Sequence, residues 1–138
     1  MKKIIVAGSR DFNNYNLIEE TLDQYLSDKN LDPKDVEIVS GCARGADTLG
    51  EQYAKNRGIP VAKFPADWGL YGKSAGFVRN SEMAKYGNVL FAFYADANVK
   101  SKGTSIMIKV AKQRGLEVHV IEPNTLLKEE EDNSYDKS

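Results

Sequence analysis

Apolar residues along this chain follow two kinds of pattern that alternate from one end to the other. Short runs that are apolar or β-branched almost throughout predict buried strands at residues 3–7, 36–40, 61–64, 89–94 and 116–121. Segments with apolar residues at helical spacing predict amphipathic helices at 14–28, 46–57, 75–86 and 103–114. Apolar strands that alternate with helices indicate a parallel sheet covered on both faces. The predicted fold class is therefore α/β, a Rossmann-like three-layer sandwich with a mainly parallel sheet.

The C-terminal end of the chain departs from this pattern. From residue 128 onward charged residues dominate, and Tyr135 is the one large apolar side chain. A segment of this composition cannot bury enough apolar surface to fold. We therefore expect one domain at residues 1–123 and a polar, disordered tail at residues 124–138.

Composition and charge restrict the classes of function. The 138 residues are 41% hydrophobic and 28% charged, and the net charge is −1. Without a general excess of basic residues, we expect neither nucleic acid nor a membrane as a partner. Cys42 and His119 are the single residues of their types, which argues against a disulfide within the chain and against a zinc site. We expect no metal, no cofactor, no leader peptide and a cytoplasmic location.

Four turns of unusual composition follow the predicted strands. They span residues 8–11, 40–45, 67–73 and 102–105. Parallel strands end at the same edge of a sheet, and ligands of such folds bind outside those ends. The four turns therefore predict one shared ligand site, and their agreement is stronger evidence than any turn alone.

Two of these turns have the chemistry of an anion site. Gly41 and Gly45 let a ligand approach the backbone, and the helix that follows attracts anions at its N-terminus. Arg44 adds a bidentate donor for phosphate or carboxylate. Residues 103–105, Gly-Thr-Ser, resemble a second phosphate cradle before a later helix, so we expect a phosphate between the two turns. The alternative interpretation is that both turns only cap their helices.

Three further side chains suit a nucleotide ligand. Trp68 would stack on a base, Asp47 would orient Arg44 or accept a hydrogen bond from a ribose hydroxyl, and Arg79 would add positive charge. Each has a structural alternative. An exposed aromatic residue often covers its own loop, a carboxylate in the first turn favours the helix dipole, and helical arginines usually lie at the surface.

Taken together, these motifs resemble the YspA-like, cpYpsA-related branch of the SLOG superfamily, whose wider members include the Lonely Guy phosphoribohydrolases and DNA-processing protein A. The matching segments are residues 8–12, 40–47, 79–84 and 102–105. The resemblance implies that residues 1–123 form a Rossmann-like domain with a pocket for a nucleotide or a nucleotide-derived ligand. The candidate ligand-binding residues are Gly8, Ser9, Arg10, Ser40, Gly41, Arg44, Gly45, Asp47, Trp68, Arg79, Asn80, Gly103, Thr104 and Ser105.

One position departs from the enzymes of the superfamily. The phosphoribohydrolases carry a Pro-Gly-Gly-x-Gly-Thr-x-x-Glu segment whose Glu acts in catalysis. Aligning its Gly-Thr on Gly103 and Thr104 puts Met107 at the Glu position. A thioether cannot take up a proton or stabilise a cationic sugar as a carboxylate can. We assign no catalytic residue; the candidates are Arg79, Asp47 and Asp67.

Three functions follow as hypotheses. The favoured one is a cytosolic binding module that senses or sequesters a nucleotide or nucleotide-derived ligand. The alternative is an enzyme that hydrolyses the N-glycosidic bond of nucleoside monophosphates, with Asp47, Asp67 or Asp96 in place of the missing Glu. The third is a nucleic-acid-associated module, which the near-neutral charge argues against.

The last predicted helix also bears on assembly. Proteins that resemble this one commonly form homodimers through helices beside the pocket. Ile106, Ile108 and Val110 offer more apolar faces than one contact with a sheet needs. We therefore expect a homodimer or a higher homo-oligomer.

Overall fold

The computed structural model describes residues 1–96 and 98–122, so the predicted tail at 124–138 lies outside the described residues. Its strands are β1 (Lys2–Gly8), β2 (Val36–Ser40), β3 (Val61–Lys63), β4 (Val89–Phe93) and β5 (Glu117–Ile121). They form one parallel sheet in the order β3-β2-β1-β4-β5. At its centre, Ile4 of β1 pairs with Ile38 of β2 and with Val89 of β4. The predicted α/β, Rossmann-like sandwich is confirmed.

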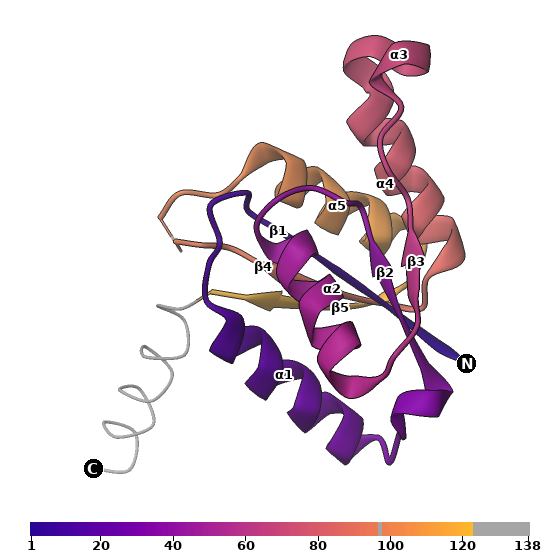
Figure 1. Cartoon of the computed structure of the whole chain (residues 1–138). Helices are drawn as coiled ribbons and strands as arrows, with labels where there is room; N and C mark the ends of the chain where they lie inside the picture. The colour runs from indigo at the N-terminus through magenta and orange to yellow at the C-terminus, as the bar shows by residue number, and fades with distance from the viewer. Residues whose placement is uncertain (97, 123–138) are drawn as a thin grey trace.

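Helices cover both faces of this sheet (Figure 1). They are α1 (Tyr15–Asp28), α2 (Ala46–Arg57), α3 (Trp68–Tyr71), α4 (Ala75–Tyr86) and α5 (Lys102–Gln113), with 3-10 turns η1 (Pro33–Asp35) and η2 (Gly72–Ser74). Helices α1 and α2 lie on one face, α4 and α5 lie on the other, and α3 projects at the far end of α4. Right-handed crossovers that leave the centre of the sheet in opposite directions produce this arrangement. No helix among the described residues has the length and apolarity needed to cross a membrane.

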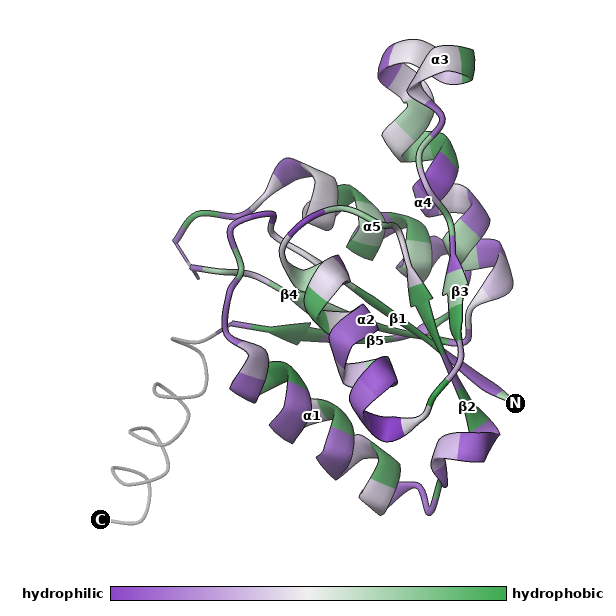
Figure 2. Ribbon diagram, in the orientation of Figure 1, coloured by the Kyte–Doolittle hydropathy of each residue, from purple (hydrophilic) through white to green (hydrophobic). Residues whose placement is uncertain are grey.

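The alternation of side chains along β1 builds a separate core on each face. Ile4 and Val6 point into the core beneath α1 and α2, whereas Ile5 and Ala7 point into the core beneath α4 and α5. All four are buried. Figure 2 shows the consequence: the strands are mainly green, while α1 is striped with purple where its outer face meets solvent.

A network of polar side chains ties α1 to α2. Arg57 donates to Asp23 through Nε at 3.1 Å and Nη2 at 2.7 Å, and to Glu19 at 3.0 Å. The Tyr53 hydroxyl donates to the same Asp23 carboxylate at 2.6 Å. The hydrogen bonds from Arg57 hold the pKa of Asp23 below its usual range, and burial raises the pKa of Tyr53. Arg57 is therefore a structural residue.

Two predicted segments differ from the structure. Residues 67–73, expected as loop, contain α3 and the start of η2. Asp67 caps α3 by accepting from the Leu70 N–H at 3.0 Å. The final helix begins at Lys102 and not at Gly103, with Ser101 as its N-cap. Residues 103–105 are therefore the first turn of α5 and not a loop before it.

Candidate functional site

A cleft lies at the carboxyl edge of the sheet and consists of two cavities with shared walls. The first, here called the arginine pocket, has a volume of about 410 Å³ and is lined by Arg10, Gly41, Cys42, Ala43, Arg44, Pro65, Ala66, Trp68 and Arg79. The second, the Asp47 pocket, has a volume of about 390 Å³ and is lined by Ala7, Gly8, Arg10, Ala43, Asp47, Trp68, Lys73, Gly76, Phe77, Arg79, Asn80, Met83, Ser101, Lys102, Gly103, Thr104, Ile106 and Met107. Arg10, Ala43, Trp68 and Arg79 line both, so the two cavities are neighbouring parts of one cleft.

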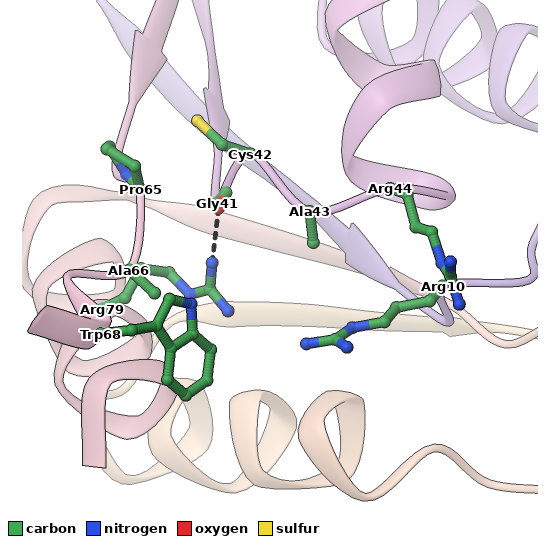
Figure 3. Close-up of a pocket in the computed structure, with 9 residues that line it drawn as sticks. All are labelled: Arg10, Gly41, Cys42, Ala43, Arg44, Pro65, Ala66, Trp68 and Arg79. Carbon is green, nitrogen blue, oxygen red and sulfur yellow. Dashed lines mark hydrogen bonds between the residues drawn. The ribbon is translucent and has the colours of Figure 1, made fainter. Parts of the chain in front are cut away.

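The arginine pocket concentrates positive charge. Figure 3 shows Arg10 extending across the cavity toward Arg79 and Trp68, while Arg44 reaches from the loop before α2 toward Arg10. None of the three arginines forms a salt bridge with the residues that the structure describes. No carboxylate lines this pocket. Guanidinium groups arranged in this way suit a phosphate, because each can donate two parallel hydrogen bonds.

Arg79 is held in place by the protein. Its Nη1 donates to the Gly41 carbonyl at 2.5 Å and its Nε donates to Asn80 Oδ1 at 2.9 Å. A Cβ on residue 41 would lie 2.6 Å from Arg79 Nη1, so a larger residue there would displace the guanidinium from its place against the backbone. Asn80 is itself buried. Arg79 therefore joins α4 to the end of β2 as well as lining the cleft.

Asp47 is a buried carboxylate in the second pocket. It is 4% exposed and accepts from the Ala43 N–H through Oδ2 at 3.3 Å. Burial raises its pKa to about 6, against the opposing effects of the Ala43 N–H and of Arg79. A carboxylate with this pKa changes charge near neutral pH, which is a common property of functional sites.

Four of the predicted site residues lie outside both pockets and hold the loops in place. Buried Ser9 donates its N–H to the Phe93 carbonyl, and its own carbonyl accepts from the first N–H of α2 at Ala46. Ser40 donates to Glu51 at 2.6 Å. Ser105 shares a hydrogen bond with the Tyr94 hydroxyl.

Gly45 is the fourth. It has a φ of +85°, and a Cβ there would lie 2.3 Å from the Ser9 carbonyl oxygen. The loop after β1 therefore covers the start of α2, where we expected an anion to approach.

The other ten predicted residues line the cleft, and their roles as ligand contacts stay a prediction. Gly8 ends β1 and lines the Asp47 pocket together with Gly103 and Thr104. Thr104 is buried, and its N–H donates to the Ser101 hydroxyl at 3.5 Å. Since Ala43 lines the same pocket, one cavity contacts both turns between which we expected a phosphate.

Several wall residues escaped the sequence reasoning. Lys73 and Lys102 add two more cations to the Asp47 pocket, and Phe77 and Ile106 add apolar surface. Both lysines are exposed. Each lysine lies in one of the four turns predicted to form the ligand site, so its position in the sequence could have identified it as a candidate. Phe77 fits the pattern of an ordinary amphipathic helix, so the sequence did not indicate that it lines a pocket.

The candidate carboxylates for hydrolysis are not equivalent. Asp67 is exposed and caps α3, and Asp96 accepts from the Asn98 N–H within its own loop. Neither lines a pocket described above, whereas Asp47 does. Met107 is 1% exposed and forms part of the same wall. Among the described residues, no group of three or more His, Cys, Asp or Glu side chains could hold a metal ion.

Sequence comparison relates this chain to a known family. The sequence profile of the YspA, cpYpsA-related SLOG family (YAcAr) matches residues 2–71. The Gene 61 protein of Mycobacterium phage D29 is 31% identical over 124 residues, which cover 86% of this chain and 94% of that protein. The family match extends from β1 through α3 and so includes Arg10, Arg44 and Trp68.

Solved structures with a similar fold include two examples of DNA processing protein A (DprA). The protein from Streptococcus pneumoniae has a TM-score of 0.63 at 18% identity, covering 86% of this chain and 49% of that chain. The protein from Helicobacter pylori has a TM-score of 0.61 at 16% identity, covering 93% and 72%. This chain thus spans about half the length of the pneumococcal protein. At these identities the likeness concerns the fold.

The comparison corrects one expectation. The Helicobacter pylori structure is described by the single-stranded DNA binding mode of its protein, which contradicts our expectation that nucleic acid is not a partner of a chain with this fold. The expectation was wrong because it was based on the net charge of the whole chain. A total of −1 averages over the whole surface, whereas the arginine pocket gathers Arg10, Arg44 and Arg79 at one place. The family and the fold indicate a function related to nucleotides or nucleic acids.

Proposed function

This chain belongs to the YspA, cpYpsA-related SLOG family, and on that premise we propose that it is a binding module for a nucleotide or a nucleotide-derived ligand, which it senses or sequesters. The observation that carries the proposal is the arginine pocket. Arg10, Arg44 and Arg79 surround one open cavity, and no carboxylate of its lining neutralises them. Guanidinium groups that face one open cavity can each donate two hydrogen bonds to the same anion, so a phosphate group is the occupant that this chemistry fits best.

The walls beside the arginines suit the rest of a nucleotide. Trp68 is 54% exposed and lines both pockets, which leaves its indole free to stack on a base. The walls favour binding over hydrolysis, because Met107 cannot supply a proton or a negative charge. Asp47 is the carboxylate that remains close to such a ligand.

Ligand identification and titration test this proposal together. Nucleotides released from the purified, denatured protein are identified by mass spectrometry, and adenosine monophosphate (AMP) is titrated into the protein by calorimetry. Arg10→Ala and Arg44→Ala should each lower the affinity by about 10- to 150-fold, since a hydrogen bond to a charged group contributes about 1.5–3 kcal/mol. Arg114→Ala is the matched control, because Arg114 is an exposed arginine just after the far end of α5.

The same samples distinguish binding from turnover. We expect AMP to be recovered intact after incubation with the protein. Release of free adenine that disappears in Asp47→Asn would show that the protein is a hydrolase. Unaltered affinity in both arginine variants would remove the arginine pocket from the ligand site.

A second candidate is binding of single-stranded nucleic acid, favoured by the aromatic residues of the projecting segment. Trp68, Tyr71 and Phe77 are 54%, 43% and 57% exposed, and two of them line the cleft beside its cations. Stacking on aromatic residues next to a basic groove is the usual way to bind single strands of about 4–16 nucleotides. Fluorescence anisotropy with labelled oligo(dT) distinguishes the two candidate functions. Binding of single-stranded nucleic acid would be favoured if the dissociation constant for oligo(dT) rises steeply with salt concentration and does not change when AMP is added.

A further inference from the structure

The two pockets of the cleft share walls, but only one of them contains a carboxylate. Every ionisable side chain of the arginine pocket apart from the Cys42 thiol is a guanidinium. The Asp47 pocket contains one carboxylate beside the cations of Arg10, Arg79, Lys73 and Lys102, and its apolar walls include Ile106 and Met107. Asp47 is the one carboxylate in the lining of either pocket, so a ligand whose one end is an anion and whose other end carries a hydrogen-bond donor has a preferred direction in this cleft.

Asp47 offers an acceptor to that ligand. Its Oδ2 accepts from the Ala43 N–H at 3.3 Å, and the Gly41 N–H also stabilises the charged carboxylate. No side chain among the described residues donates to Oδ1. Every fully buried side-chain oxygen or nitrogen in the described residues has a partner. Oδ1 must therefore reach the space of the pocket, although the residue as a whole is 4% exposed. A carboxylate oxygen that faces the pocket has lone pairs available for a hydrogen-bond donor of a bound ligand.

The donor cannot be a phosphate, because two anions repel each other at short range. We propose that Asp47 accepts a hydrogen bond from a sugar hydroxyl of a nucleotide whose phosphate lies between Arg10 and Arg44. This inference rests on the proposed function and adds the direction of the ligand and the group that Asp47 recognises. The apolar walls beside Asp47 then contact the sugar and the base. Asp47 thus selects ligands with a free hydroxyl on the ribose.

Removing the hydroxyl groups of the ligand tests this assignment. The two probes are AMP and 2′,3′-dideoxyadenosine monophosphate, which keep the same base and phosphate. Wild type should bind AMP at least about tenfold more tightly, the effect of one hydrogen bond to a charged group. In Asp47→Asn and Asp47→Ala the preference should fall to threefold or less. Both variants should bind inorganic phosphate at least as tightly as wild type does, because a repelling charge is gone.

The outcomes separate this inference from the proposed function. Equal affinity of wild type for the two probes would overturn the role of Asp47 and leave the binding module intact. A preference that persists in both variants would do the same. If wild type binds neither AMP nor phosphate while oligo(dT) binds wild type and Asp47→Asn equally, both proposals fail. Circular dichroism melts confirm that each variant is folded, and two variants guard against a fold defect in one.

Discussion

Four of the five arginines of this protein fall into two groups, one on the α1–α2 face and one in the cleft. Arg57 forms ion pairs with Glu19 and Asp23, which joins two helices into one rigid surface. Arg10 and Arg44 form neither hydrogen bonds nor ion pairs with the side chains that the structure describes, and they surround an open cavity. The same side chain thus stabilises the fold in one place and is available for a ligand in the other.

The difference shows which charges contribute to stability and which to binding. A partly exposed ion pair contributes up to about 1 kcal/mol to the stability of the folded protein without any ligand. An unpaired cation in a cavity contributes to stability when an anion arrives. Arg79 belongs to both groups, because it bonds to Gly41 and Asn80 and also lines the cleft.

The largest effect is expected for Arg79→Ala, because this variant should lose both ligand affinity and stability. Loss of its contact with the ligand should cost about 1.5–3 kcal/mol of binding free energy. Loss of its bonds to Gly41 and Asn80 should lower the free energy of unfolding by about 1 kcal/mol as well. Calorimetry with AMP and urea unfolding measure the two losses separately. An unchanged midpoint of urea unfolding would mean that Arg79, like Arg10 and Arg44, contributes to ligand binding and not to stability.

Asp47→Asn should stabilise the folded protein at pH 7 by up to about 3 kcal/mol, since each pKa unit corresponds to about 1.4 kcal/mol. The pKa of Asp47 is raised to about 6 in the folded state, so the folded protein binds more protons than the unfolded chain between about pH 4 and pH 6. Its stability therefore falls as the pH rises through that range and stays lower above it.

The amide of the Asp47→Asn variant does not titrate in this range, so its stability lacks this dependence on pH. Urea unfolding of both proteins from about pH 4 to about pH 8 gives the difference curve, which should grow between about pH 4 and pH 6 and then level off. A flat difference would contradict the burial of an ionised Asp47 at neutral pH.

Arg57→Ala should have the opposite profile to Arg10→Ala. Removing Arg57 breaks two ion pairs of partly exposed groups, and we expect the free energy of unfolding to fall by about 1–2 kcal/mol. The affinity for AMP should stay the same. Thermal melts and calorimetry on the two variants sharpen the comparison, and a loss of affinity in Arg57→Ala would mean that the α1–α2 face also controls the cleft.

The smallest effect is expected for Gly103→Ala. A Cβ at this position meets no atom within 4 Å, and alanine in the first turn of α5 should raise the free energy of unfolding by about 0.5–1 kcal/mol. If the phosphate lies between Arg10 and Arg44, the affinity for AMP should not change. A fall of tenfold or more would place the phosphate against the start of α5 instead.

The sequence predicted the layers of the fold better than the details of the site. Helix α2 begins and ends where the pattern placed it, since Gly45 and Gly58 stop the helix at both ends by local geometry. Helix α3 was missed because four residues are too few for a periodic pattern. The start of α5 was shifted because Gly103 suggests a turn, although Ser101 caps the helix two residues earlier.

Local sequence patterns predicted only part of the candidate site. Sequence motifs identified ten residues of the cleft, because turns at the ends of parallel strands converge at one edge. They could not show that the carbonyl of Ser9 closes the start of α2, since that contact joins two loops. The apolar face of α5 was also overestimated. Val110 is buried, and Ile106 and Ile108 pack against the core, so the homo-oligomer stays a prediction.

The central place of β1 has a consequence for how the protein is made. Ile4 pairs with Val89, 85 residues further along the chain. At about 5–20 residues per second, a ribosome needs about 4–17 s to synthesise the segment between them. During that time one edge of β1, with its buried Ile5 and Val6, has no neighbouring strand. We therefore expect the nascent chain to need protection from aggregation until β4 leaves the ribosome.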